Sequence, residues 1–150
     1  MSDDYAEYEL ECEKIRQQNA VLLSKFSDWL TGQGLSETTT RRHVTNIDLY
    51  INHYLLYEDA IPAERGWYSV GMFLGYWFIR KAMWASESSI RSNAASLKKF
   101  YTFMVQMGMV LEEDVRDLHE TIKSGMPNWL ATMRRYDDPS IEERGDIWGV

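Results

Sequence analysis

The sequence predicts an all-α protein, a compact bundle of five to six helices joined by short connections. Over long windows the apolar residues recur at spacings of three and four, as they do on one face of an α-helix. Only three prolines interrupt the 150 residues, which leaves long stretches free to form helix. No alternation of apolar and polar residues, the pattern typical of a strand, continues for more than four residues.

The first predicted helix spans about residues 5–31. Gly32 and Gly34 follow it, as is typical of a helix end that needs a left-handed residue. The residues before Ile15 are polar and acidic, so we expect this part of the helix either to fray or to pack elsewhere. The later turns carry a clear apolar face, formed by Leu22, Phe26, Trp29 and Leu30.

A segment at residues 35–55 occurs a second time fifty residues later, at 85–105. In each copy a hydroxyl-rich start is followed by an Arg in the first two turns and by an amphipathic helix of about 20 residues. The two copies predict one helix over residues 37–57 and another that begins at residue 86 or 88 and ends at 107, before Gly108.

The helical period gives each copy a buried face and an outward face. The predicted buried residues are Thr40, Val44, Ile47, Ile51 and Leu55 in the first copy, and Ile90, Ala94, Leu97, Tyr101 and Met104 in the second. The predicted outward residues are Arg42, Asn46, Leu49 and His53, then Ser92, Ser96, Lys99 and Phe103. Whether Leu49 and Phe103 pack on another helix or contact a partner stays open.

The helix predicted between the two copies, over residues 68–83, is unusually apolar. Gly71 and Gly75 stand four residues apart on it. Two interpretations stay open: these glycines admit the close approach of a neighbouring element, or they relieve crowding among aromatic side chains. The inner face of this helix comprises Val70, Phe73, Leu74, Trp77 and Phe78.

The C-terminal third predicts two short helices. One spans residues 111–123 and is closed by Ser124 and Gly125, and the other spans residues 127–136 and begins with a proline at a permitted position. Residues 137–150 lack a period, and we interpret them as a flexible acidic tail or as a tail that docks.

Length and composition describe one globular domain, large enough to bury a core. We divide it into an acidic N-terminal extension with helical potential at residues 1–14, a helical domain at 15–136 and the tail at 137–150. The lone Cys12 cannot form an internal disulfide. No apolar run is long enough for a signal peptide or a membrane span. These features predict a cytoplasmic protein without a membrane partner.

The net charge of −7 is distributed unevenly. Residues 36–107 carry eight Lys or Arg against six Asp or Glu, whereas both ends of the chain are acidic. The basic surplus therefore falls on the repeated segment, and the overall charge is a poor guide to that surface.

No set of residues in the sequence is suited to catalysis. It contains no Gly-rich phosphate loop, no Gly-x-Ser-x-Gly elbow and no His-Glu-x-x-His pair. His43 and His53 lie on the helix predicted over residues 37–57 and His119 lies on the one over 111–123, and none has an obvious catalytic partner. We therefore expect a protein that is not an enzyme and that uses no cofactor or metal.

Several motifs occur in a characteristic order: Trp29-Leu30, Gly34-Leu35-Ser36, Thr38-x-x-x-Arg42, Ser88-Ser89-Ile90-Arg91, Leu97-Lys98-Lys99-Phe100-Tyr101 and Gly108. In this order the chain resembles, over about residues 18–125, the N-terminal core-binding domain of tyrosine recombinases, the phage integrase family. The resemblance implies a SAM-like helical bundle that forms one half of a clamp on duplex DNA. The family's catalytic half is a separate domain. Its His-x-x-Arg motif is missing here, so we expect no DNA cleavage by this chain alone.

The resemblance implies that the starts and outer faces of the two repeated helices contact the major groove and its flanking phosphates. A helix N-terminus also presents free N–H groups and a partial positive charge to a phosphate. The same residue types serve equally as ordinary helix caps and solvated charges. The candidate DNA-binding residues are Thr38, Thr39, Arg41, Arg42, Asn46, Ser88, Ser89, Arg91, Ser92, Ser96 and Lys99.

Two functions are compatible with these observations. The first is a non-catalytic module that binds double-stranded DNA weakly and with a strong dependence on salt. The second is a protein-interaction domain that keeps the fold but has lost the DNA contacts, and that pairs with itself or with a full-length recombinase. In a third arrangement the acidic tail covers the basic face, and its removal would tighten DNA binding.

Overall fold

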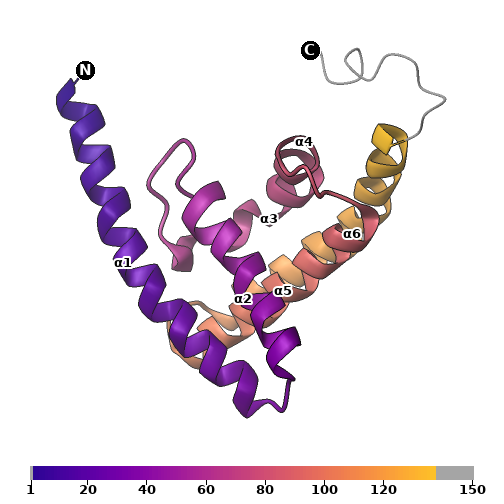
Figure 1. The fold of residues 1–150 in the computed structure, drawn as a ribbon, viewed down its shortest axis with the longest axis horizontal. Coiled ribbons are helices and arrows are strands. Elements are labelled where there is room, and N and C mark those ends of the chain that lie inside the picture. Colours follow the sequence, from indigo (N-terminus) through magenta and orange to yellow (C-terminus); the bar gives the residue numbers. More distant parts are fainter. Residues whose placement is uncertain (1, 138–150) are drawn as a thin grey trace.

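The computed structural model describes residues 2–137, and over this range the chain is all-α, with five helical stretches (Figure 1). This confirms the predicted fold class. Within these residues, no helix is both long and apolar enough to cross a membrane. Residues 138–150, which hold nearly all of the predicted tail, lie outside the described range, and Asp137 is the last residue of the final helix.

Helix α1 (Ser2–Gly32) runs without a break. It ends where Gly34 adopts φ 87°, the left-handed conformation that favours glycine. The N-terminal part of this helix does not fray, because Cys12 and Ile15 are buried in a small cluster with Leu56, separate from the main core. The second of the two expectations for the acidic stretch is therefore the one observed.

Helix α2 (Glu37–Leu49) continues into a π-helical turn, η1 (Tyr50–Tyr54). The amide of Leu55 bonds to the carbonyl of Tyr50 at 2.9 Å, which leaves other carbonyls of this turn in need of a donor. The buried Asn19 of α1 supplies one, because its Nδ2 donates to the carbonyl of Ile51 at 3.1 Å and to Asn52 Oδ1 at 2.8 Å. The wider turn is thus stabilised from another helix.

The predicted helix over residues 68–83 forms as a series of short elements. They are a 3₁₀ turn, η3 (Trp67–Ser69), then α3 (Val70–Met72), a second π turn η4 (Phe73–Trp77) and α4 (Phe78–Lys81), and a separate 3₁₀ turn, η2 (Ala63–Arg65), precedes them. Phe73 packs on Tyr50 with ring centroids 4.9 Å apart, so the two π turns meet through aromatic rings.

Two buried tyrosine hydroxyls hold the loop before these elements. Tyr50 donates to the carbonyl of Gly66 at 2.5 Å, and Tyr101 donates to the carbonyl of Ala63 at 2.8 Å. Burial raises the pKa of both phenols well above their ordinary value, so they remain protonated donors. The loop is therefore fixed to the centre of the core.

Helix α5 (Glu87–Gln106) is the second copy of the repeat, and Gly108 with φ 74° ends it as predicted. Helix α6 (Glu112–Asp137) is continuous, so the prediction of two short helices divided at Ser124 and Gly125 is wrong. Pro127 removes one backbone donor and costs the helix a few kcal/mol. Burial of Leu130 and Met133 in the main core offsets that loss.

The side chain of Trp129 explains why glycine occupies positions 75 and 125. A Cβ placed on Gly75 would lie 2.4 Å from Trp129 Nε1, and a Cβ on Gly125 would lie 2.2 Å from its Cζ2. The indole therefore lies directly against both backbones, and no larger residue fits at either position without movement. Both interpretations of the glycine pair therefore apply at Gly75, because the neighbouring helix approaches closely and the group for which the glycine makes room is an aromatic side chain.

Nearly all residues of the two predicted buried faces are buried. Two residues that were predicted to face outward are buried as well. All five inner residues of the second copy are buried, and in the first copy only Val44 is partly exposed. Ser96 and Phe103 were predicted to face outward, and this is wrong: they are 0% and 2% exposed. Phe103 packs on Phe26 and Trp29 of α1, with ring centroids 5.5 and 5.8 Å apart. Leu49 is partly buried against the main core.

Candidate nucleic-acid interface

The two copies of the repeat, α2 and α5, cross each other within their first three turns (Figure 1). Polar side chains join them at the crossing. Asn46 Nδ2 donates to Ser92 Oγ at 3.0 Å and to Ser96 Oγ at 2.9 Å. His43 Nδ1 lies 2.7 Å from Ser96 Oγ. These polar contacts thus fix α2 to α5 within the first three turns of each helix, close to the two capped starts.

Hydrogen-bond accounting assigns the proton positions at this crossing. The hydroxyl of Ser96 donates its one hydrogen to the carbonyl of Ser92 at 3.1 Å, and it accepts from Asn46. His43 can then satisfy Ser96 only as a donor, which assigns the proton to Nδ1. Burial lowers the pKa of His43, and the charges of Lys99 and Arg42 lower it further. The ring is therefore neutral at pH 7.

This crossing changes the role of three candidate residues. The side chain of Asn46 donates to both Ser92 and Ser96, and the hydroxyl of Ser96 donates to the carbonyl of Ser92. These bonds hold α2 on α5, so the three side chains are not free groups presented to solvent. A helical wheel that assumes a single buried stripe does not predict these contacts. Helix α5 packs against α1, α2 and α6, and so is covered on more than one side. Ser96, fully buried, is no longer a candidate contact.

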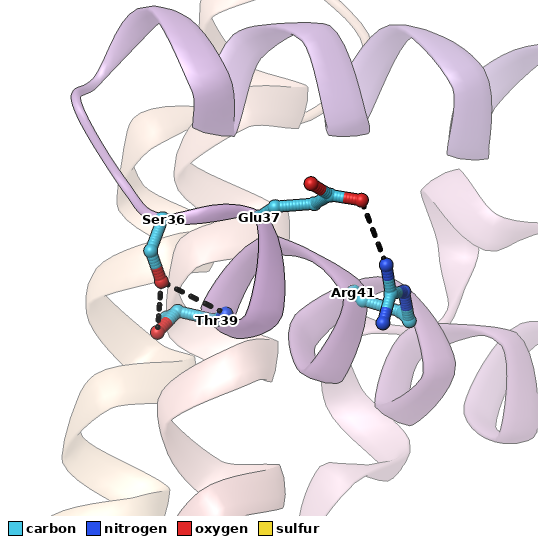
Figure 2. Close-up of polar contacts among 4 residues, drawn as sticks. All are labelled: Ser36, Glu37, Thr39 and Arg41. Carbon is cyan, nitrogen blue, oxygen red and sulfur yellow. Dashed lines mark hydrogen bonds and ion pairs between the residues drawn. The ribbon is translucent and has the colours of Figure 1, made fainter.

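The start of α2 is capped as predicted (Figure 2). Ser36 Oγ accepts from the amide of Thr39 at 3.2 Å and lies 3.0 Å from Thr39 Oγ1. Arg41 forms an exposed ion pair with Glu37, with Nη2 to Oε1 at 2.8 Å. The side chains of Thr39 and Arg41 are therefore engaged within α2, although an exposed pair of this kind is weak, about 0.3–0.5 kcal/mol.

The start of α5 is capped in the same way, with a reciprocal capping box. Ser86 Oγ accepts from the amide of Ser89 at 3.0 Å, and Ser89 Oγ accepts from the amide of Ser86 at 2.8 Å. Arg134 of α6 binds Glu87 beside this cap, with Nε to Oε1 at 3.0 Å. Ser89 therefore serves the cap, and α6 covers part of the helix start.

Among residues 2–137, four cations on these two helices have no acidic partner. Arg42, Arg91, Lys98 and Lys99 form no ion pair within the described part of the chain. Arg42 and Arg91 are exposed, and both lysines are partly exposed. Three of the four, all on α5, line one open hollow of about 470 Å³ together with Ala94, Ala95 and Met126. Arg42 and Lys99 lie close enough to His43 for the charge of each to lower its pKa.

The remaining candidates are exposed hydroxyls. Thr38 and Ser88 lie in the first turns of α2 and α5, and both are exposed. Lys98 was not among the predicted residues, although its position beside Lys99 was a signal for it. The structure thus divides the predicted set into free groups (Thr38, Arg42, Ser88, Arg91 and Lys99), groups engaged in caps or an ion pair (Thr39, Arg41 and Ser89) and groups at the crossing (Asn46, Ser92 and Ser96).

Residues 2–137 contain no group of three or more His, Cys, Asp or Glu side chains that could hold a metal ion. The unpaired cations are suited to binding an anion such as a phosphate. Comparison of the chain with family models, curated proteins and solved structures found no match in any of the three.

Proposed function

We propose that the exposed face of α2 and α5 binds the phosphate backbone of double-stranded DNA. The observation that carries this proposal is the set of four cations, Arg42, Arg91, Lys98 and Lys99, without an ion-pair partner among residues 2–137. Elsewhere on these helices charged groups do pair, as Arg41 does with Glu37. All four cations offer charge to phosphates, and Arg42 and Arg91, which lie in the first two turns of α2 and α5, also stand near free backbone donors.

The binding is weak and not specific for sequence. Asn46 and Ser92, which could have bonded to base edges, are bonded to each other, so phosphate contacts supply the affinity. Each phosphate contact contributes about −0.9 to the slope of log K against log salt concentration, so four contacts give roughly −3 to −4. The dissociation constant then falls in the range of about 10⁻⁴ to 10⁻⁶ M that is typical of non-specific binding.

Fluorescence anisotropy with a labelled duplex in low salt tests the proposal. The variant Arg42→Glu/Lys99→Glu reverses two of the four charges, and we expect it to weaken binding by at least about tenfold and to flatten the salt slope. The control Lys25→Glu/Lys123→Glu changes the net charge equally, at exposed lysines on α1 and α6.

Two results would refute the proposal. One is the absence of binding by the unaltered chain in low salt. The other is an equal loss of binding in both double variants, since this would reflect total charge rather than the α2 and α5 face. In either case the alternative, a protein-interaction domain with this fold, would be favoured.

A further inference from the structure

An apolar hollow of about 500 Å³ lies where the end of α2 meets the end of α4. We call it the groove. Leu49, Trp77 and Trp84 form its apolar wall, and its remaining lining includes His53 and Lys81 but no carboxylate. Trp84 is 61% exposed, so a large aromatic side chain stands open at the rim.

Aromatic and methionine side chains gather around this groove. Met83 beside it is 99% exposed, and Tyr57, which also lines it, is exposed as well. Aromatic residues and methionine are the types enriched where proteins contact one another. Lys81 contributes a positive charge at the rim, with Nζ 5.5 Å from the centre of the Tyr57 ring. The groove therefore suits an apolar side chain flanked by acidic groups.

The first turns of α1 carry that combination. Residues 3–13, called the arm, contain six Asp or Glu and no Lys or Arg. Leu10 is 65% exposed and lies on the side opposite Tyr8 and Cys12, which pack on Leu56. Glu7 and Glu13, three residues to either side of Leu10, share its face. Figure 1 shows the first turns of α1 projecting beyond the other helices.

We propose that the arm of one copy of this chain docks in the groove of a second copy. Leu10 enters the apolar hollow, and Glu7 and Glu13 face Lys81 at its rim. The arm is acidic, whereas the groove lining holds the cation Lys81 and no carboxylate. Both also present an exposed apolar group. Within one chain this contact does not form, because the arm packs on Leu56 through the face opposite Leu10.

The contact joins two different surfaces, so it is head-to-tail. Each copy has one arm and one groove, and a dimer made this way leaves one arm and one groove open for further copies. Association should therefore rise progressively with protein concentration rather than stop at a dimer, unless the copies close into a ring. Because the attraction between arm and groove is partly ionic, salt should weaken it.

Sedimentation velocity on the full chain without DNA, over a concentration series in low and high salt, tests the proposal. We expect the sedimentation coefficient to rise with concentration in low salt and to rise less in high salt. The groove variant Lys81→Glu and the arm variant Glu7→Lys/Glu13→Lys should each weaken association by at least about tenfold. Lys123→Glu, an exposed change on α6, should leave it unchanged.

Mixing the two defective variants gives the decisive result. The groove variant keeps an intact arm and the arm variant keeps an intact groove, and the reversed charges of the two variants also attract each other, so an equimolar mixture should regain the association that neither variant shows alone. A symmetric contact of groove with groove would leave the arm variant associating as the unaltered chain does, and this result would overturn the proposal. So would an unaltered chain that stays monomeric at all concentrations. The substituted side chains lie on the surface, and circular dichroism checks that the variants fold.

Discussion

Replacing Gly75 by alanine is expected to destabilise the protein, although alanine is the better helix former. The new Cβ would lie 2.4 Å from Trp129 Nε1 and 2.6 Å from Cδ1, whereas an ordinary contact is about 3.5–4 Å. The rigid indole cannot shift away freely, because the backbone of Gly125 lies on its other ring. Overpacking of this kind costs about 1–3 kcal/mol, and helix propensity returns up to about 1 kcal/mol.

The net change is therefore a loss of about 1–2 kcal/mol in the free energy of unfolding. Urea unfolding followed by circular dichroism measures it. Gly32→Ala is the matched control, since a Cβ there meets nothing within 4 Å, and it should be neutral or stabilising. If Gly75→Ala proved as stable as Gly32→Ala, the argument from close approach would be refuted. In a Trp129→Leu background the penalty for Gly75→Ala should shrink, because the two residues are coupled.

Three further changes have expected outcomes. Tyr50→Phe removes the hydrogen bond to the buried carbonyl of Gly66 and should cost about 1–2 kcal/mol of unfolding free energy, measured in urea. Ser86→Ala removes the capping box of α5 and should cost about 1 kcal/mol in the same assay, with no loss if the cap is dispensable. His43, whose pKa lies below its ordinary value of 6.5, binds a proton less readily in the folded than in the unfolded chain. Its contribution to stability is therefore present above pH 6.5 and is lost as the pH falls through the folded-state pKa. His43→Gln should make the unfolding free energy fall less steeply than in the unaltered chain when the pH is lowered from about 7 to about 5, and an identical slope would contradict this assignment.

The sequence predicted the features that depend on neighbouring residues along the chain. The caps at Ser36 and Ser86 and the helix ends at Gly34 and Gly108 are all local, because each requires only a hydroxyl or a glycine at the correct position. The inner face of the second copy followed from its helical period, and all five of its predicted residues are buried.

Features that depend on contacts between distant segments were not predicted. Local rules divide α6 near Pro127, but the packing of Trp129 against Gly75 and the burial of Leu130 in the main core keep it continuous. The π turn after α2 depends on Asn19, which lies on another helix. Ser96 is buried because α5 is covered by several helices, and no helical wheel of one segment contains that information.

The same limit applies to the candidate interface. The pattern identified the exposed cations Arg42 and Arg91, because charge and outward position are readable from one helix. It did not show that Asn46 and Ser92 face each other, since this depends on the angle at which α2 and α5 cross. The chain therefore uses part of its polar repeat to assemble the fold, and only the cations and two hydroxyls remain available to a ligand.

The single cysteine, Cys12, is buried beside Leu56, so its reactivity with a thiol reagent reports local opening of this part of the fold. Cys12 is 1% exposed and belongs to a cluster of only three buried residues, far smaller than the main core. A thiol reagent can reach it only when the first half of α1 separates from the Leu56 segment. The rate of labelling then measures that separation under native conditions, while the rest of the helix stays anchored through Phe26 and Leu30. A single native side chain thus makes the motion of the acidic end measurable without an added probe.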